Sequence, residues 1–103
     1  MAIYRSWYID EQIKDYLQGF SAILIERAKA IGKTSSASKI ANFTYNLDLK
    51  ATQEQLRLSP EILLNQTKPI LLDEWQHLPN IWNFVRHAID DGLPDGSLIF
   101  AGS

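Results

Sequence analysis

Residues 21–36 read SAILIERAKAIGKTSS, an apolar run followed by a turn and then by Gly32-Lys33-Thr34. The consecutive apolar residues at 22–25 predict a strand that is covered on both faces. The small residues that follow predict a helix over residues 33–41 that lies close against this strand. A strand, a turn and a helix that opens on G-K-[ST] are the pattern of a phosphate-binding loop.

The full pattern of such a loop is G-x-x-x-x-G-K-[ST], and here Gly32, Lys33 and Thr34 occupy its last three positions. In an intact loop, backbone N–H groups converge on the phosphates, the lysine bridges outer phosphate oxygens, and the hydroxyl binds Mg²⁺. The alternative is that Lys33 is a solvated lysine and Thr34 an ordinary first-turn residue, but their place after a buried strand favours the binding role. We therefore predict phosphate contacts by Arg27, Ala28, Lys29, Ala30, Ile31, Gly32, Lys33, Thr34 and Ser35.

Arg27 stands in place of the first glycine of the pattern, and two consequences are open. That glycine turns sharply out of the strand, so a side chain there stores about 1–3 kcal/mol of strain or forces the loop to relax. A guanidinium close to the site could instead pair with a phosphate and recover part of the loss. Our hypothesis is that strain dominates and that the loop fits phosphate less well.

Length and composition describe one small domain of 103 residues, which buries roughly 65% of its unfolded surface. Hydrophobic residues make up 46% of the chain, but no apolar run approaches the roughly 20 residues that cross a bilayer. The chain has no cysteine, and residues 1–12 lack the apolar core of a signal peptide, so we expect a cytoplasmic protein. Without a long apolar run we expect no membrane among its partners, and with a net charge of −2 we expect no nucleic acid for this segment alone.

The segments on either side of the loop also have regular patterns. Residues 9–17 predict an amphipathic helix with Asp10 as its N-cap and Gly19 just beyond its end. Apolar and polar residues alternate over 43–47, which predicts a strand with one better-buried face. One of these elements precedes the strand and helix of the loop in the sequence, and the other follows them.

The second half of the chain continues the alternation of helices and strands. A capping-box pattern at residues 52–55 and the Ser-Pro-Glu of residues 59–61 predict two short helices. Residues 69–72 predict a buried strand, Asn80 caps the next helix, and residues 97–101 predict the last strand. Strands that alternate with helices favour a parallel sheet, in which ligands bind beyond the carboxyl ends of the strands.

Two acidic residues, Asp73 and Glu74, end the predicted strand over residues 69–72. In nucleotide hydrolases, an aspartate at such a strand end helps to hold Mg²⁺, and a following glutamate can orient the attacking water. The alternative is that the two carboxylates only end a strand. They fall at the same edge of the sheet as Lys33 and Thr34, and this placement favours a joint site for nucleotide and metal.

The segments LIERAKAIGKTSSA, YNLDL and SPEILLNQTKPILLDEWQHLPNIWNFVRHAIDDGLPDGSLIFAGS resemble the N-terminal ATPase core of prokaryotic AAA+-like ATPases that carry an uncharacterised C-terminal domain. The most specific part is D-E-W-Q followed by proline, a tryptophan-bearing helix and a strand ending in G-S. The resemblance implies ATP and Mg²⁺ as cofactors, with Lys33 on the phosphates and Thr34 and Asp73 on Mg²⁺. It further implies that Glu74 activates water and that Ser103 occupies a phosphate-sensing position.

The resemblance also implies a fold, an α/β three-layer P-loop NTPase core with a mostly parallel sheet and helices on both faces. In the family's strand order 5-1-4-3-2, this chain supplies about four strands, so we expect an incomplete core over residues 21–103 after a helical segment over residues 1–20. The expected parent couples ATP binding and hydrolysis to conformational change. The alternative is a catalytically silent remnant or an interaction module, and the open sheet edge invites self-association.

Overall fold

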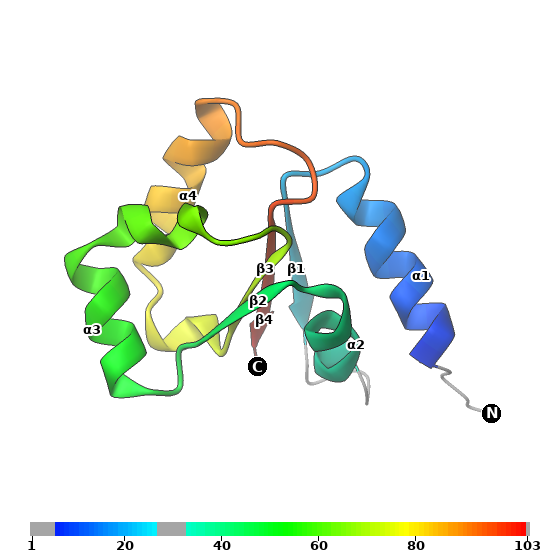
Figure 1. The fold of residues 1–103 in the computed structure, drawn as a ribbon, viewed down its shortest axis with the longest axis horizontal. Coiled ribbons are helices and arrows are strands. Elements are labelled where there is room, and N and C mark those ends of the chain that lie inside the picture. The colour runs from blue at the N-terminus through cyan, green and yellow to red at the C-terminus, as the bar shows by residue number, and fades with distance from the viewer. Residues whose placement is uncertain (1–5, 27–32, 103) are drawn as a thin grey trace.

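The computed structural model describes the backbone of residues 6–26 and 33–102, and the side chains of residues 11–25 and 37–102. Helices and strands alternate along this part of the chain (Figure 1). The α-helices are α1 (Ser6–Leu17), α2 (Lys33–Ile40), α3 (Lys50–Leu58) and α4 (Ile81–Asp90). The strands are β1 (Ala22–Glu26), β2 (Phe43–Asn46), β3 (Ile70–Asp73) and β4 (Leu98–Gly102). Two 3₁₀ helices, η2 (Pro60–Asn65) and η3 (Trp75–His77), complete the description.

The four strands form one parallel sheet in the order β1-β4-β3-β2. This is the 1-4-3-2 part of the order implied by the family resemblance, so the predicted topology is confirmed. The chain crosses from β1 to the far edge of the sheet at β2 and then returns through β3 to β4. An α/β sheet with this order is consistent with an incomplete P-loop NTPase core.

Helices cover both faces of the sheet, as Figure 1 shows, with α1 and α2 on one side and α3 and α4 on the other. This division follows from the topology, because right-handed crossovers in opposite directions along a sheet place their helices on opposite faces. The connection from β1 to β2 runs one way across the sheet, and the connections that contain α3 and α4 run back. The predicted three-layer arrangement is therefore confirmed.

Alternate residues of the central strands fill two separate cores. Ile70 and Leu72 of β3, with Leu98 and Phe100 of β4, pack toward α3, η2 and α4. The side chains between them pack toward the helices of the opposite face, forming a second cluster of Ile13, Leu17, Ile25, Ala37, Leu71, Ile99 and Ala101. Because both strands are buried on both faces, their apolar runs are continuous, as is typical of parallel sheets.

Strand β1 differs from the prediction that it is covered on both faces. Ile25 is buried beneath α1 and α2, but 60% of the Leu24 side chain is exposed on the opposite face. The reason is its position, since β1 is hydrogen-bonded to β4 on one side and to no described strand on the other. An apolar run therefore identified the strand correctly but not its place at the edge.

Helix α1 does not begin as predicted. It starts at Ser6, so Asp10 lies inside the helix and is not its N-cap. Ile13 and Leu17 are buried against the sheet and α2, whereas Tyr16 is 52% exposed, so the buried face is narrower than expected. No helix in the described ranges is long and apolar enough to cross a membrane.

The start of α3 also corrects a prediction. The helix begins at Lys50, directly after the turn that follows β2, so Thr52 lies inside it and no capping box forms with Gln55. That turn is closed by hydrogen bonds of its own, including one from the Gln53 side chain to the Leu47 carbonyl at 2.8 Å. The start of α3 is thus set by the turn, before the chain reaches the residues of the capping pattern.

The later segments begin where they were predicted but differ in detail. Pro60 is the first residue of a helix, as expected, but this helix is 3₁₀ rather than α-helical. Asn80 is at the N-cap of α4 but makes no side-chain hydrogen bond there. Gly92 follows α4 with a φ of 98°, in the left-handed region that favours glycine, which explains the stop at this residue.

Candidate functional site

The carboxyl ends of the four strands lie in one row. Gly102 of β4 is in register with Glu26 of β1, and Asp73 of β3 lies between Ala101 of β4 and Asn46 of β2. The helix that follows β1 along the chain, α2, lies on one face of the sheet, whereas α3 and α4, which follow β2 and β3, lie on the other. Such a divergence is the switch point at which open parallel sheets bind their ligands.

Helix α2 begins toward this edge, because the chain just after its last residue lies at the opposite edge, where Asn42 N donates to the Pro69 carbonyl at 2.8 Å. The helix then packs against β1, β3 and β4. Its N-terminus therefore presents the positive end of the helix dipole and unpaired backbone N–H groups to the carboxyl edge. The strand and the helix predicted from residues 21–36 are confirmed, and residues 27–32 between them lie outside the described residues.

The predicted phosphate contacts themselves are not tested by the described part of the chain. Lys33, Thr34 and Ser35 form the first turn of α2, and their side chains are outside the description. The remaining predicted contacts lie outside the described residues altogether: Arg27, Ala28, Lys29, Ala30, Ile31, Gly32 and Ser103. Their roles stay predictions.

Asp73 is the last residue of β3, and its position is fixed from two sides. Its backbone carbonyl accepts a hydrogen bond from Leu47 N at 2.9 Å, and the next peptide is bonded to β4. The Oδ1 atom of its carboxylate is buried. The predicted metal ligand is therefore held on the sheet itself, at the edge where α2 begins.

Glu74 adopts the left-handed conformation, with φ 58° and ψ 44°. A residue with a side chain pays roughly 1–2 kcal/mol for this conformation, so its surroundings must hold it there. Its N–H donates to the carbonyl of Ala101 at 2.7 Å, which ties the turn after β3 to the end of β4. This strained position, directly after Asp73, marks Glu74 as a functional candidate.

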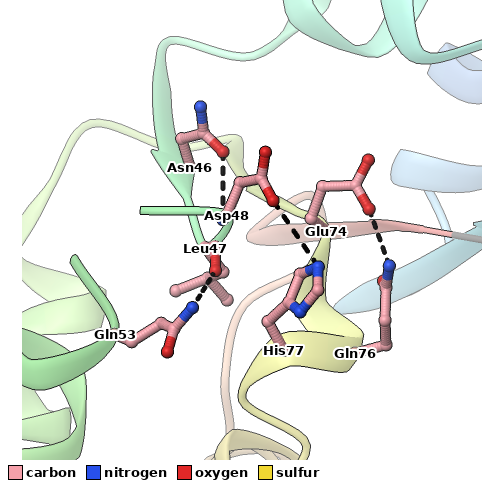
Figure 2. A network of polar contacts seen from close by, with 7 residues as sticks. All are labelled: Asn46, Leu47, Asp48, Gln53, Glu74, Gln76 and His77. Atoms are coloured by element: carbon pink, nitrogen blue, oxygen red, sulfur yellow. Dashed lines mark hydrogen bonds and ion pairs between the residues drawn. The ribbon is translucent and has the colours of Figure 1, made fainter. Parts of the chain in front are cut away.

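Gln76 is a member of the site whose role the sequence did not predict. Its side-chain Nε2 donates to Glu74 Oε1 at 2.6 Å, as Figure 2 shows. The only signal in the sequence is its place in the D-E-W-Q segment, two residues after Glu74. Side chains two residues apart do not face each other on a helix, and here the left-handed turn at Glu74 precedes the 3₁₀ helix that carries Gln76.

A second link joins the residues after β3 to the turn after β2. His77 Nε2 lies 3.5 Å from Asp48 Oδ1, and both side chains are largely exposed. In the same turn, Asp48 N donates to the side chain of Asn46 at 3.1 Å. Figure 2 shows these residues beside Glu74 and Gln76, so polar contacts connect the ends of β2 and β3.

The residues at this edge suit Mg²⁺ that is shared with water and phosphate better than a metal ion held by protein side chains alone. No group of three or more His, Cys, Asp or Glu residues that could hold a metal occurs among the residues the structure describes. Mg²⁺ takes hard oxygen ligands and is usually held by one or two carboxylates together with waters and substrate phosphates. The half-buried carboxylate of Asp73, at the edge toward which the anion-favouring N-terminus of α2 is directed, fits this mode of binding.

Comparison with known proteins gives one finding on the family. The family model described as AAA domain matches residues 19–103, which is most of the chain and includes every strand of the sheet. No curated protein and no solved structure matches the sequence.

Proposed function

This chain belongs to the AAA domain family, and we propose that it binds ATP together with Mg²⁺ at the carboxyl edge of its sheet. The observation that carries the proposal is the shared position of Asp73 and the start of α2 on that edge. The Asp73 carboxylate favours a cation, whereas the N-terminus of a helix favours an anion. A phosphate chain with its metal ion satisfies both, because the phosphates face the helix and the cation faces the carboxylate.

The proposed roles follow from this placement. Lys33 neutralises the outer phosphates, while Thr34 and Asp73 hold the Mg²⁺ that accompanies them. Glu74 orients the water that attacks the terminal phosphate, and Ser103 contacts that phosphate from the end of β4. In a longer parent protein, binding and hydrolysis would be coupled to a conformational change. Support for these finer roles comes from the loop pattern, the family and the row of strand ends.

Replacing Lys33 by alanine tests the loop assignment. We expect Lys33→Ala to weaken the binding of a fluorescent Mg-nucleotide at least about tenfold, because a charge-assisted hydrogen bond contributes roughly 1.5–3 kcal/mol. Lys39→Ala is the matched control, since this lysine lies in the last turn of the same helix. Equal affinity of Lys33→Ala and the unaltered chain would rule out the proposed phosphate site.

A second candidate function is association of two copies through the open edge of the sheet. The described part of the chain has no strand on the outer side of β1, and Leu24 is exposed there. Beside it is a mainly apolar hollow of about 220 Å³, which Trp75, Trp82 and Phe100 help to line. Edge strands of this kind are templates for pairing with another chain.

Sedimentation velocity over a range of concentrations tests this association. If two copies pair through β1, the unaltered chain should dimerise at high concentration, and Leu24→Lys should remain monomeric because a charge would be buried in the pair. Leu58→Lys is the control, as Leu58 is 71% exposed at the end of α3, away from the edge. Identical behaviour of all three proteins would argue against this function.

A further inference from the structure

The side-chain amide of Gln76 lies between Glu74 and the last residue of β4. Its nitrogen donates to Glu74 Oε1, while its oxygen is buried and accepts no hydrogen bond from the described residues. Only the nitrogen can face the carboxylate, because an ionised carboxylate is solely an acceptor. The amide orientation is therefore determined by Glu74 and not by the surroundings of the oxygen.

The space for this amide exists because residue 102 is glycine. A Cβ built at Gly102 would overlap Gln76 Oε1 and would lie 3.3 Å from Gln76 Cδ and 3.2 Å from Trp75 Cδ1. Trp75 is itself fixed, with its ring edge-to-face on Phe100 at a centroid distance of 5.5 Å. The amide thus occupies a slot bounded by the β4 backbone and an anchored tryptophan.

The energetics favour a positioning role over a contribution to stability. Burying an unsatisfied carbonyl oxygen opposes folding, and an apolar side chain of similar size would fill the slot without this cost. What an apolar side chain cannot do is hold one oxygen of the Glu74 carboxylate by a charge-assisted hydrogen bond. The unfavourably buried Gln76 Oε1 therefore belongs to the same amide whose Nε2 binds Glu74, the proposed water-activating residue.

We propose that Gln76 is a positioning residue, which holds the Glu74 carboxylate at a fixed orientation relative to the end of β4. The role in hydrolysis rests on the proposed nucleotide function. The hydrogen bond from Gln76 Nε2 to Glu74 Oε1, which we call the clamp, is present without nucleotide. Because Gly102 precedes Ser103, the clamp also links Glu74 to the strand end that carries the proposed phosphate-sensing residue. Movement of that strand end would therefore release or reorient Glu74.

A charge-swap cycle in the full 103-residue chain tests the clamp without nucleotide. At pH 8, Gln76→Glu should raise the unfolding equilibrium constant by about tenfold, because two carboxylates replace a hydrogen-bonded pair. Adding Glu74→Gln should restore stability at pH 8 by reversing donor and acceptor. Gln55→Glu, on an exposed face of α3, should change little.

Additive effects of the two substitutions in this cycle would mean that Gln76 only fills space and would overturn the proposal. Gly102→Ala provides an independent variant, because it should displace the amide and abolish the interaction between positions 74 and 76. Persistence of that interaction in the Gly102→Ala background would equally count against the clamp. These stability measurements are made without nucleotide. A failure of the proposed phosphate site, which Lys33→Ala tests, can therefore be told apart from a failure of the clamp.

Solvent exchange of the Gln76 side-chain amide can be measured in the unaltered chain and tests the clamp directly. In NMR spectra, the side-chain NH₂ of Gln76 should exchange with solvent at least about tenfold more slowly than that of the exposed Gln55, because it is hydrogen-bonded to a carboxylate. The single substitution Glu74→Gln should shift the Gln76 signals and leave those of Gln55 in place. Equal exchange rates for the two amides would refute the clamp.

Discussion

Phe100→Ala should destabilise the domain by about 3–5 kcal/mol, the usual cost of removing a buried phenylalanine. Phe100 is 2% exposed in an inner strand, and the rings of Trp75 and Trp82 meet it edge-to-face at 5.5 and 5.4 Å. A small domain has roughly 5–15 kcal/mol of stability in total, so this one substitution removes a large part of it. It also removes the ring on which Trp75 packs, and Trp75 borders the slot that holds the Gln76 amide.

Urea denaturation measures this loss as a lower midpoint for Phe100→Ala. The control is Phe20→Ala, because Phe20 is 56% exposed and contacts Tyr16 at a ring distance of 6.3 Å. We expect that control to cost less than about 1 kcal/mol. Similar midpoints for the two variants would show that the core beneath α4 is not packed around Phe100 as described.

The second large effect concerns turnover. We expect residues 1–103 alone to hydrolyse ATP negligibly, because an arginine supplied from a neighbouring subunit is worth roughly 10³–10⁵ in the rate of such sites. Arg57, one of the described arginines, lies on α3 and pairs with Glu54 of the same helix. Arg86 lies on α4 and is exposed. Neither is an evident replacement for an arginine from a partner.

A phosphate-release assay checks this prediction, with Glu74→Gln as the comparison. The unaltered chain and Glu74→Gln should both remain close to the background rate. Turnover on the scale of seconds that is lost in Glu74→Gln would contradict the prediction and would show that the chain assembles a complete catalytic site by itself.

Most of the fold could be predicted because its signals are local. The apolar runs that end at Asp73 and Gly102 identify inner strands, since few surface segments contain so many consecutive apolar residues. The turn residues, especially Gly92, separate the elements clearly. The order of the strands came from the family resemblance, because no local pattern records which strands are neighbours.

The errors occurred where a tertiary contact overrides a local pattern. Leu24 belongs to an apolar run, yet it is exposed because the outer side of β1 carries no described strand. Thr52 and Gln55 have capping-box spacing, but the turn after β2 starts α3 three residues earlier, with Leu49 rather than Thr52 at the N-cap. In both cases the pattern identified the element and a neighbour in space determined its details.

The sequence predicted where the charged residues of the candidate site lie but not their geometry. Asp73 and Glu74 were singled out because carboxylates after a buried strand are a sequence pattern with a chemical meaning, and their roles stay predictions. The left-handed conformation of Glu74 depends on a hydrogen bond to Ala101, 27 residues away in sequence, and could not be read locally. The slot for Gln76 depends in the same way on Gly102.

The most direct test of the central claim is an NMR titration of the chain with ADP and Mn²⁺ in place of Mg²⁺. Mn²⁺ broadens signals from nearby nuclei, so it reports where the metal–nucleotide complex binds. We predict selective broadening of the amides of Asp73, Glu74 and Gly102 and of the first turn of α2, which is lost in Lys33→Ala. Broadening centred on the opposite edge, around Ser21 and Ser97, or none at all, would contradict the assignment of a nucleotide site to this edge.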